Sequence, residues 1–206
     1  MFRAVGNRCA VDFSELHLPM TNREAMTMLT SLNFQAIEVN LLKIARACIG
    51  ASRYQRGSRL ADAPDVLDCS SFIKWLYAQR GIWLPRRTVQ QMEIGTPIDL
   101  SNIVAGDVIF TTGRVNYYLD DPAQGVGHAG FATGEGTVVH AANSRTGIVE
   151  SKLDNFLGKC ELRGVRRYLD NPADVLTLLT PPRREVETSD DIRWIILQRL
   201  PCSCSS

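Results

Sequence analysis

A change in the spacing of apolar residues along the chain constrains the fold most strongly. Up to about residue 80, apolar residues recur at three- and four-residue spacing, which is typical of helix faces. After Pro85 the pattern changes to short apolar runs separated by turn residues, which is typical of strands. The expected strands cover residues 107–111, 129–133, 137–141, 147–150 and 164–169. Because helices come first and no βαβ alternation is present, we expect an α+β domain whose antiparallel sheet packs on a central helix.

Three helices are expected before the strands. Residues 21–32 are moderately helical. Apolar positions across residues 34–48 follow one face of a second helix, which Gly50 would end. After a loop over residues 51–67, Asp68 is a good N-cap for a third helix that ends near Gly81. This prediction places Cys69 in the first turn of the central helix.

The length of 206 residues suits one domain with extensions. We predict a main domain over residues 34–170, an N-terminal extension over residues 1–33 and a C-terminal extension over residues 171–206. Within the C-terminal extension, residues 192–200 form a short apolar helix candidate.

Composition excludes several classes of partner. The 23 basic and 22 acidic side chains give a net charge of +1, so no global field favours nucleic acid or an anionic membrane. No apolar stretch approaches the ~20 residues of a membrane-spanning helix. The first ten residues lack the apolar run of a signal peptide, so we expect a cytoplasmic chain or export by a non-standard route. The pattern does not indicate an oligomeric state.

The six cysteines are too sparse for a disulfide-stapled scaffold, and we expect most of them to be reduced. Cys48 lies on an apolar helix face and should be buried as a small hydrophobic residue. Cys202 and Cys204 lie in a polar tail, where solvated thiols are expected.

One cysteine and two histidines form a candidate catalytic set. Cys69 at a helix start meets unpaired N–H groups and the positive end of the helix dipole, which favour a thiolate. His128 and His140 lie on two expected strands joined by a glycine-rich turn, so both imidazoles should reach the same end of the ladder. A nucleophile, a base and a third group that orients the base are what covalent amide hydrolysis requires.

Two other interpretations fit the same spacing. His128 and His140 could be core histidines satisfied by carbonyl groups, or the two histidines could form a zinc site with Cys69. The catalytic interpretation needs no metal and no cofactor, so it predicts that a chelator has no effect.

Five sequence blocks resemble, in composition and order, those of the NlpC/P60 cysteine peptidases. The blocks are residues 68–72 (DCSSF), 81–86 (GIWLPR), 105–110 (AGDVIF), 127–131 (GHAGF) and 138–142 (VVHAA). The resemblance runs from about residue 34 to residue 169 and implies a papain-like α+β fold for the main domain. It also implies a hydrolase without a cofactor that cuts an amide bond in peptidoglycan stem peptides, often after γ-D-glutamate, through a thioester.

The resemblance assigns roles position by position. Cys69 resembles the nucleophile, His128 the base and His140 the residue that orients the base. The remaining positions implied to hold the oxyanion or the substrate are Tyr54, Asp68 and Ser70. Of these, Tyr54 would lie near the reacting carbonyl, and Asp68 resembles a carboxylate that receives a free substrate amine while also capping the helix.

The chain departs from the family pattern around this site. The departures are Arg56 and Ser58 in the turn after Tyr54, Ser71 at a usual glycine, and Gly127 at a common serine. Residues 115–127 are long for a hairpin connection, and we expect them to form a flap near the site. Two further functions stay open: acyl transfer to an amine or lipid by the same thioester, and a catalytically silent domain that binds muropeptides.

Overall fold

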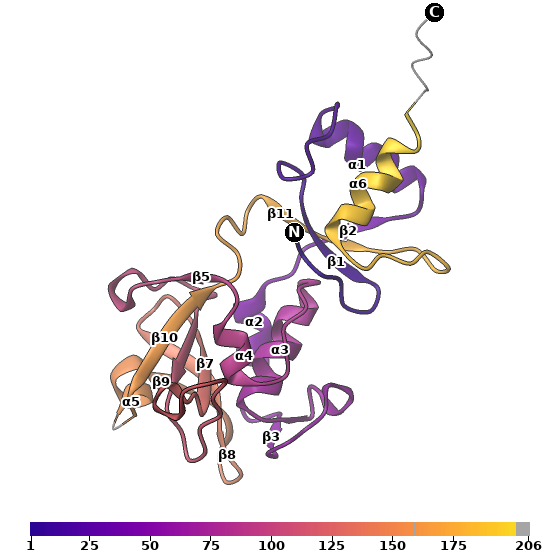
Figure 1. Ribbon diagram of the computed structural model, residues 1–206. Coiled ribbons are helices and arrows are strands. Elements are labelled where there is room, and N and C mark those ends of the chain that lie inside the picture. The colour runs from indigo at the N-terminus through magenta and orange to yellow at the C-terminus, as the bar shows by residue number, and fades with distance from the viewer. Residues whose placement is uncertain (159, 201–206) are drawn as a thin grey trace, which may run out of the picture. The chain divides into compact units, whose positions relative to one another are not determined.

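A computed structural model describes residues 1–158 and 160–200 (Figure 1). The chain divides into two compact units. The first unit contains residues 1–39, residues 78–83 and the chain from residue 171 on, and the second contains residues 40–77 and 84–170. Cys202 and Cys204 lie outside the described residues, and the four described cysteines, Cys9, Cys48, Cys69 and Cys160, are free thiols.

The first unit joins the two ends of the chain in one antiparallel sheet. Its strands follow the order β1 (Arg8–Asp12), β11 (Val175–Leu179) and β2 (Gln35–Ile37). Two helices, α1 (Asn22–Ser31) and α6 (Ser189–Leu197), share its apolar core. The sequence predicts two separate extensions over residues 1–33 and 171–206. In the structure β1 from the first region and β11 from the second pair along their whole length.

One expected helix is only partly present. The apolar spacing over residues 34–48 predicts a single helix, but β2 occupies residues 35–37, and α2 (Leu41–Ala47) begins only after Asn40. The side chain of Asn40 accepts a hydrogen bond from the Lys43 N–H at 2.9 Å, which caps α2 at that point. Phe34 packs in the core of the first unit instead of on a helix face. The regular apolar spacing across residue 40 therefore does not mark one helix, because it runs through a strand and a separate helix.

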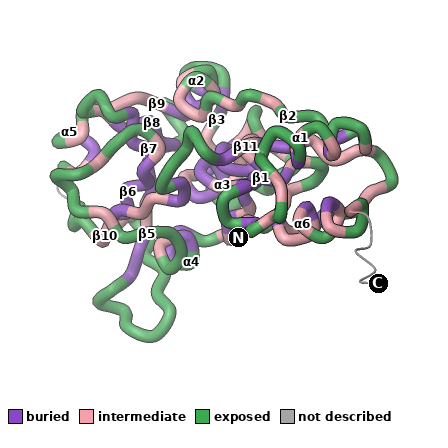
Figure 2. Tube along the Cα trace, turned by 90° about the horizontal axis from the view of Figure 1, so that it is seen from above, coloured by how far each residue is buried: buried purple, intermediate pink, exposed green. Residues whose placement is uncertain are grey.

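The second unit contains a six-stranded sheet in which every pairing is antiparallel. Its order is β5 (Thr96–Pro97), β10 (Leu162–Arg167), β6 (Val108–Thr111), β7 (His128–Ala132), β8 (Thr137–Asn143) and β9 (Gly147–Lys152). The central strands β6 and β7 are almost wholly buried (Figure 2). Five of these strands match the expected positions, which confirms the predicted α+β class.

Shorter elements complete the second unit. They are the parallel pair β3 (Arg53–Tyr54) and β4 (Val66–Leu67), the helices α4 (Thr88–Met92) and α5 (Leu153–Leu157), and the 3₁₀ turns Leu60–Asp62, Leu100–Asn102 and Pro122–Gln124. None of the described helices combines the length and apolarity that crossing a bilayer requires.

The central helix α3 (Cys69–Gln79) is anchored by aromatic packing. Its apolar side chains are fully buried at Phe72, Ile73 and Leu76. The ring of Tyr77 lies 6.4 Å from that of Phe131 on β7 and meets the ring of Tyr168 edge-on at 5.0 Å. The Tyr77 hydroxyl donates a hydrogen bond to the carbonyl of Gly106. Because these contacts hold α3 against the sheet, the position of its first residue, Cys69, is fixed.

Candidate active site

Cys69 is the first residue of α3, directly after a strand and a capping aspartate. The register of β3 with β4 pairs Tyr54 with Leu67, two residues before the cysteine. Asp68 accepts a hydrogen bond from the Ser71 N–H at 2.8 Å, as an N-cap does. As the first helical residue, Cys69 has no carbonyl four residues earlier in its helix, so its N–H is free of that bond. The nucleophile candidate and a backbone donor therefore lie together.

His128 and His140 meet across neighbouring strands. The pairing of Phe131 with Val139 on β7 and β8 makes the two histidines diagonal neighbours on one face. Their rings are 5.1 Å apart and nearly perpendicular, and His128 Nε2 lies 3.0 Å from His140 Nδ1. The hairpin expected from the sequence thus brings the two imidazoles together.

Ser151 extends this pair to a third strand. Its Oγ lies 3.0 Å from His140 Nε2. When His140 carries its proton on Nε2 and donates to Ser151, its Nδ1 accepts the proton of His128 Nε2. His128 Nδ1 is then unprotonated and is the nitrogen left to take a proton from the thiol. Sequence reasoning missed Ser151, because only the register of β9 shows that it lies beside His140.

Phe156 packs against both imidazole rings, and Gly130 leaves room for it. Phe156 on α5 lies 5.4 Å from the ring of His128 and 4.8 Å from that of His140. A Cβ added to Gly130, between the two histidines, would come within 2.8 Å of Phe156. The Ala-Gly-Phe run after His128 therefore leaves the space that this phenylalanine fills.

Cys69 and His128 line one pocket of about 430 Å³ in the second unit. Tyr54, Asp68 and Ser70 line it as well, so the structure gathers five of the six residues expected at the site. The sixth, His140, lies behind His128. The sulfur of Cys69 is 3.9 Å from the carbonyl oxygen of Gly127, the residue before His128. Exposed Cys160 also lines the pocket and was not expected there.

The resting thiol is protonated, contrary to the sequence expectation of a thiolate. Burial and the negative charge of Asp68 raise the pKa of Cys69 to about 11. The N–H groups of Ser70 and Ala129 act in the opposite direction but have the smaller effect. Burial likewise lowers the pKa of His140 to about 4, and burial with the neighbouring His140 lowers that of His128 to about 3. At neutral pH the site therefore holds a neutral thiol beside a neutral imidazole.

Asp68 is committed to partners within the protein. Its Oδ2 accepts hydrogen bonds from Arg86 Nη2 at 2.6 Å and the Gly57 N–H at 2.8 Å. Its Oδ1 accepts from the Ser70 hydroxyl at 3.1 Å, and that hydroxyl itself accepts from Arg86 Nη1 at 2.6 Å. Burial opposes the charge, but the hydrogen bonds from Arg86, Ser71 and Gly57 outweigh it and hold the pKa of Asp68 below its ordinary value. A substrate amine would have to compete with Arg86 for this carboxylate.

Tyr54 faces the pocket as a neutral donor. Burial, with the nearby Cys69 and Asp68, raises the pKa of Tyr54 above its ordinary value. Its hydroxyl therefore keeps its proton at neutral pH.

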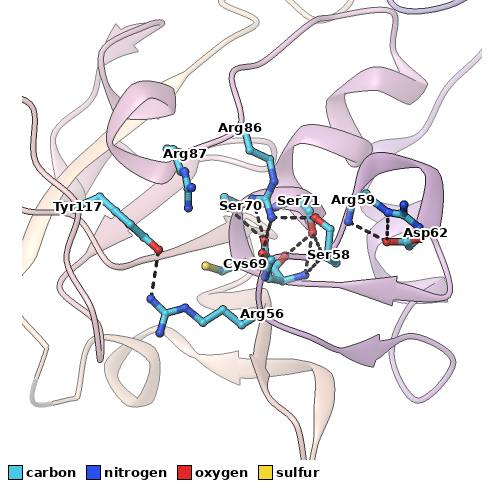
Figure 3. A network of polar contacts seen from close by, with 12 residues as sticks. Arg56, Ser58, Arg59, Asp62, Cys69, Ser70, Ser71, Arg86, Arg87 and Tyr117 are labelled. Atoms are coloured by element: carbon cyan, nitrogen blue, oxygen red, sulfur yellow. Dashed lines mark hydrogen bonds and ion pairs between the residues drawn. The ribbon is translucent and has the colours of Figure 1, made fainter.

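The connection between β6 and β7 folds back as the expected flap. Tyr117 and Val126 exchange backbone hydrogen bonds of 3.0 and 2.8 Å, and Arg114, Val115 and Tyr117 line the pocket. The Tyr117 hydroxyl accepts a hydrogen bond from Arg56 Nη2 at 3.2 Å, and both residues line the same pocket as Cys69 (Figure 3). The flap thus forms one wall of the pocket.

No group of three or more His, Cys, Asp or Glu side chains among the described residues is arranged to share a metal ion. The donor set at the pocket offers a thiol, two imidazoles bonded to each other and a carboxylate bonded to arginine. This arrangement suits proton transfer between neutral groups.

A scan against protein-family models matches the NlpC/P60 family over residues 51–167, more than half of the chain. A probable endopeptidase of Corynebacterium glutamicum is 37% identical over 112 residues, which are 53% of this chain and 48% of that protein. The murein DD-endopeptidase/LD-carboxypeptidase of Escherichia coli is 30% identical over 108 residues, 50% of each chain. The γ-DL-glutamyl hydrolase of Bacillus subtilis is 29% identical over 132 residues, 64% of this chain and 29% of that protein. The chain thus spans about half the length, or less, of these relatives.

Solved structures share the fold. The NlpC/P60 domain of the peptidoglycan hydrolase SagA superposes with a TM-score of 0.50 at 26% identity, covering 62% of this chain and 98% of that domain. An NlpC/P60 family protein from Bacillus cereus gives a TM-score of 0.51 at 23% identity, covering 63% of this chain and 39% of that one. The papain-like arrangement expected from the sequence blocks is confirmed by these matches.

Proposed function

The chain belongs to the NlpC/P60 family, and we propose that it is a cysteine peptidase that cuts a γ-D-glutamyl amide bond in peptidoglycan stem peptides. The observation that carries the proposal is the pocket that Cys69 and His128 both line, with the Cys69 sulfur 3.9 Å from the carbonyl oxygen of Gly127, the residue before His128. The hydrogen bond between His128 Nε2 and His140 Nδ1 supports it, because with His128 as the donor it leaves His128 Nδ1 to act as the base. The names of the relatives, endopeptidases and a γ-DL-glutamyl hydrolase, support the bond type.

The reaction starts from the neutral thiol of Cys69 and the neutral imidazole of His128. As the Cys69 sulfur attacks the carbonyl carbon, its proton moves to His128 Nδ1, and the Cys69 N–H and the Tyr54 hydroxyl donate to the oxyanion. His128 then gives that proton to the leaving nitrogen, and the C–N bond breaks to leave a thioester. Water attacks the thioester with His128 as base, which releases the acid and restores the thiol.

The test is mass spectrometry of a defined muropeptide after incubation with the pure protein in ¹⁸O-enriched water. We expect two fragments, of which the glutamyl fragment carries one ¹⁸O atom in its new carboxylate. Cys69→Ala should give no fragments while keeping the fold, because a thiol in the first helical turn contributes little packing. A glutamyl fragment joined to an added amine, without ¹⁸O, would instead indicate acyl transfer, and intact substrate would contradict both reactions.

A further inference from the structure

The pocket beside Cys69 has a strong excess of positive charge. Four arginines line it, Arg56, Arg86, Arg87 and Arg114. Asp68 is the one carboxylate among the described residues that line the same pocket, and it forms an ion pair with Arg86 at 2.6 Å. The other three arginines therefore line a cavity that has no second carboxylate among its described lining residues.

Tyr117 of the flap brings two of these arginines together. Arg56 donates to its hydroxyl at 3.2 Å, and the guanidinium carbon of Arg87 lies 4.7 Å from the centre of its ring. Arg56 follows β3 and Arg87 directly precedes α4, so three separate segments meet at this tyrosine. Figure 3 shows Arg56 and Tyr117 on the side to which the Cys69 sulfur points, with Arg87 above them.

A neutral phenol cannot balance two guanidinium charges. Each guanidinium has five N–H donors, and a single bond to a hydroxyl or a ring contact leaves most of them free. The hydrogen bond from Arg56 and the nearby charges of Arg56 and Arg87 also lower the pKa of Tyr117, as expected for a phenol in a positive field. A planar carboxylate is the group that matches such a pair of forked donors best.

We propose that Arg56 and Arg87, held by Tyr117, bind a carboxylate of the substrate next to the scissile amide. This inference rests on the proposed function and extends it. A glutamyl residue linked through its side-chain carboxyl keeps a free α-carboxylate close to the bond that is cut. The two arginines therefore select an acidic γ-linked glutamyl substrate over one whose α-carboxylate is amidated. Arg56 follows β3 and Tyr117 lies in the connection between β6 and β7, so this selectivity depends on loop residues outside the Cys69–His128 pair.

The experiment compares two peptides that differ in one group: L-Ala-γ-D-Glu-L-Lys and its α-carboxamide counterpart. We expect the wild-type protein to cleave the acid with kcat/KM about 10- to 100-fold above that of the amide, the range of a charge-assisted hydrogen bond. Arg56→Gln and Arg87→Gln should each reduce this ratio severalfold, and Arg56→Lys should retain part of it. The matched control is Arg59→Gln, an exposed arginine of the same unit paired with Asp62. Equal turnover of both peptides by the wild-type protein would overturn the proposal.

Failure of the proposed function gives a different result. If the wild-type protein cleaves neither peptide, binding of the same two peptides to Cys69→Ala, measured by calorimetry, decides the carboxylate site alone. Tighter binding of the acid that weakens in a Cys69→Ala, Arg56→Gln double variant supports the site. Equal binding of acid and amide refutes it, whether or not the peptides are cut.

Discussion

The hydroxyl of Ser58 lies 2.7 Å from that of Ser71, and both hydroxyls also accept a hydrogen bond from the N–H of Asp68 at 2.9 and 2.7 Å. Both serines are buried. Ser58 lies in the turn after β3 and Ser71 lies on α3, so their contact joins this turn to the first turn of the helix (Figure 3). Together the two hydroxyls hold the backbone N–H of Asp68, the residue that precedes Cys69.

Removing this contact should destabilise the fold. We expect Ser71→Ala to lower the free energy of unfolding by about 1–3 kcal/mol, because it leaves a buried hydroxyl and a buried N–H with one partner fewer. Denaturant unfolding measures the change, and Ser144→Ala, at an exposed serine of the same unit, is the control. A loss no larger than that of the control would show that the serine pair is not stabilising.

The pH dependence of Cys69 alkylation should reflect the raised pKa of its thiol. Because burial and Asp68 raise the pKa of this thiol to about 11, we expect its rate with iodoacetamide to keep rising with pH from neutral upwards. Cys160, an exposed thiol in the same pocket, is the internal reference, and peptide mapping separates the two. A rate for Cys69 that is already constant below neutral pH would indicate a preformed thiolate–imidazolium pair instead.

The histidine relay predicts graded losses of activity. His140→Ala should lower kcat by about 10²-fold, because His128 loses the partner that fixes its tautomer. Ser151→Ala should lower kcat by about tenfold or less, the value of one net hydrogen bond, and should shift the acid limb of the pH–rate profile. Exposed His17 provides the control variant His17→Ala. Equal effects of Ser151→Ala and His17→Ala would exclude Ser151 from the relay.

The sequence predicted the positions of Cys69 at a helix start and of His128 and His140 on neighbouring strands because each depends on local signals: an N-cap before Cys69, and a glycine turn between two short strands. Ser151 and Phe156 could not be found, because no local signal fixes the register of β9 or the docking of α5. The pairing of β1 with β11 was missed for the same reason, since these strands lie at opposite ends of the chain.

The raised pKa of Cys69 was missed because burial and a charged neighbour are properties of the folded site. A helix start alone indicates only the opposing effect. Similarly, Asp68 was identified as a cap and an amine receptor, but its ion pair with Arg86 depends on a loop 18 residues away. Its role in receiving an amine stays a prediction.

Acid should destabilise the protein through its buried histidines. The pKa values of His128 and His140 lie at about 3 and about 4 in the folded state, below the ordinary value near 6.5. As the pH falls below about 6.5, the unfolded chain binds protons that the folded chain does not, so the free energy of unfolding decreases. Urea unfolding at about pH 7.5 and about pH 5 should show a smaller decrease for His140→Gln than for the wild-type protein. Equal decreases would mean that His140 titrates normally.

Adding a side chain at position 127, where a serine is expected from the family resemblance, should harm this protein. A Cβ on Gly127 would clash with Asn116 Oδ1 and would lie 2.5 Å from the Gly113 nitrogen, so the flap leaves no room for a side chain. Asn116 itself accepts a hydrogen bond from the Gly113 N–H at 2.7 Å, which closes the flap at this point. We expect Gly127→Ser and Gly127→Ala to lower the free energy of unfolding by similar amounts, about 1–3 kcal/mol, because both add the same Cβ to a packed contact. Both should also lower kcat/KM, since the carbonyl of Gly127 contacts the Cys69 sulfur.

The control is Gly164→Ala, whose Cβ would meet only the end of the flexible Arg166 side chain at 3.2 Å and Met92 at 3.6 Å. Higher activity of Gly127→Ser than of the wild-type protein would show that the serine hydroxyl matters more than the space taken by the flap.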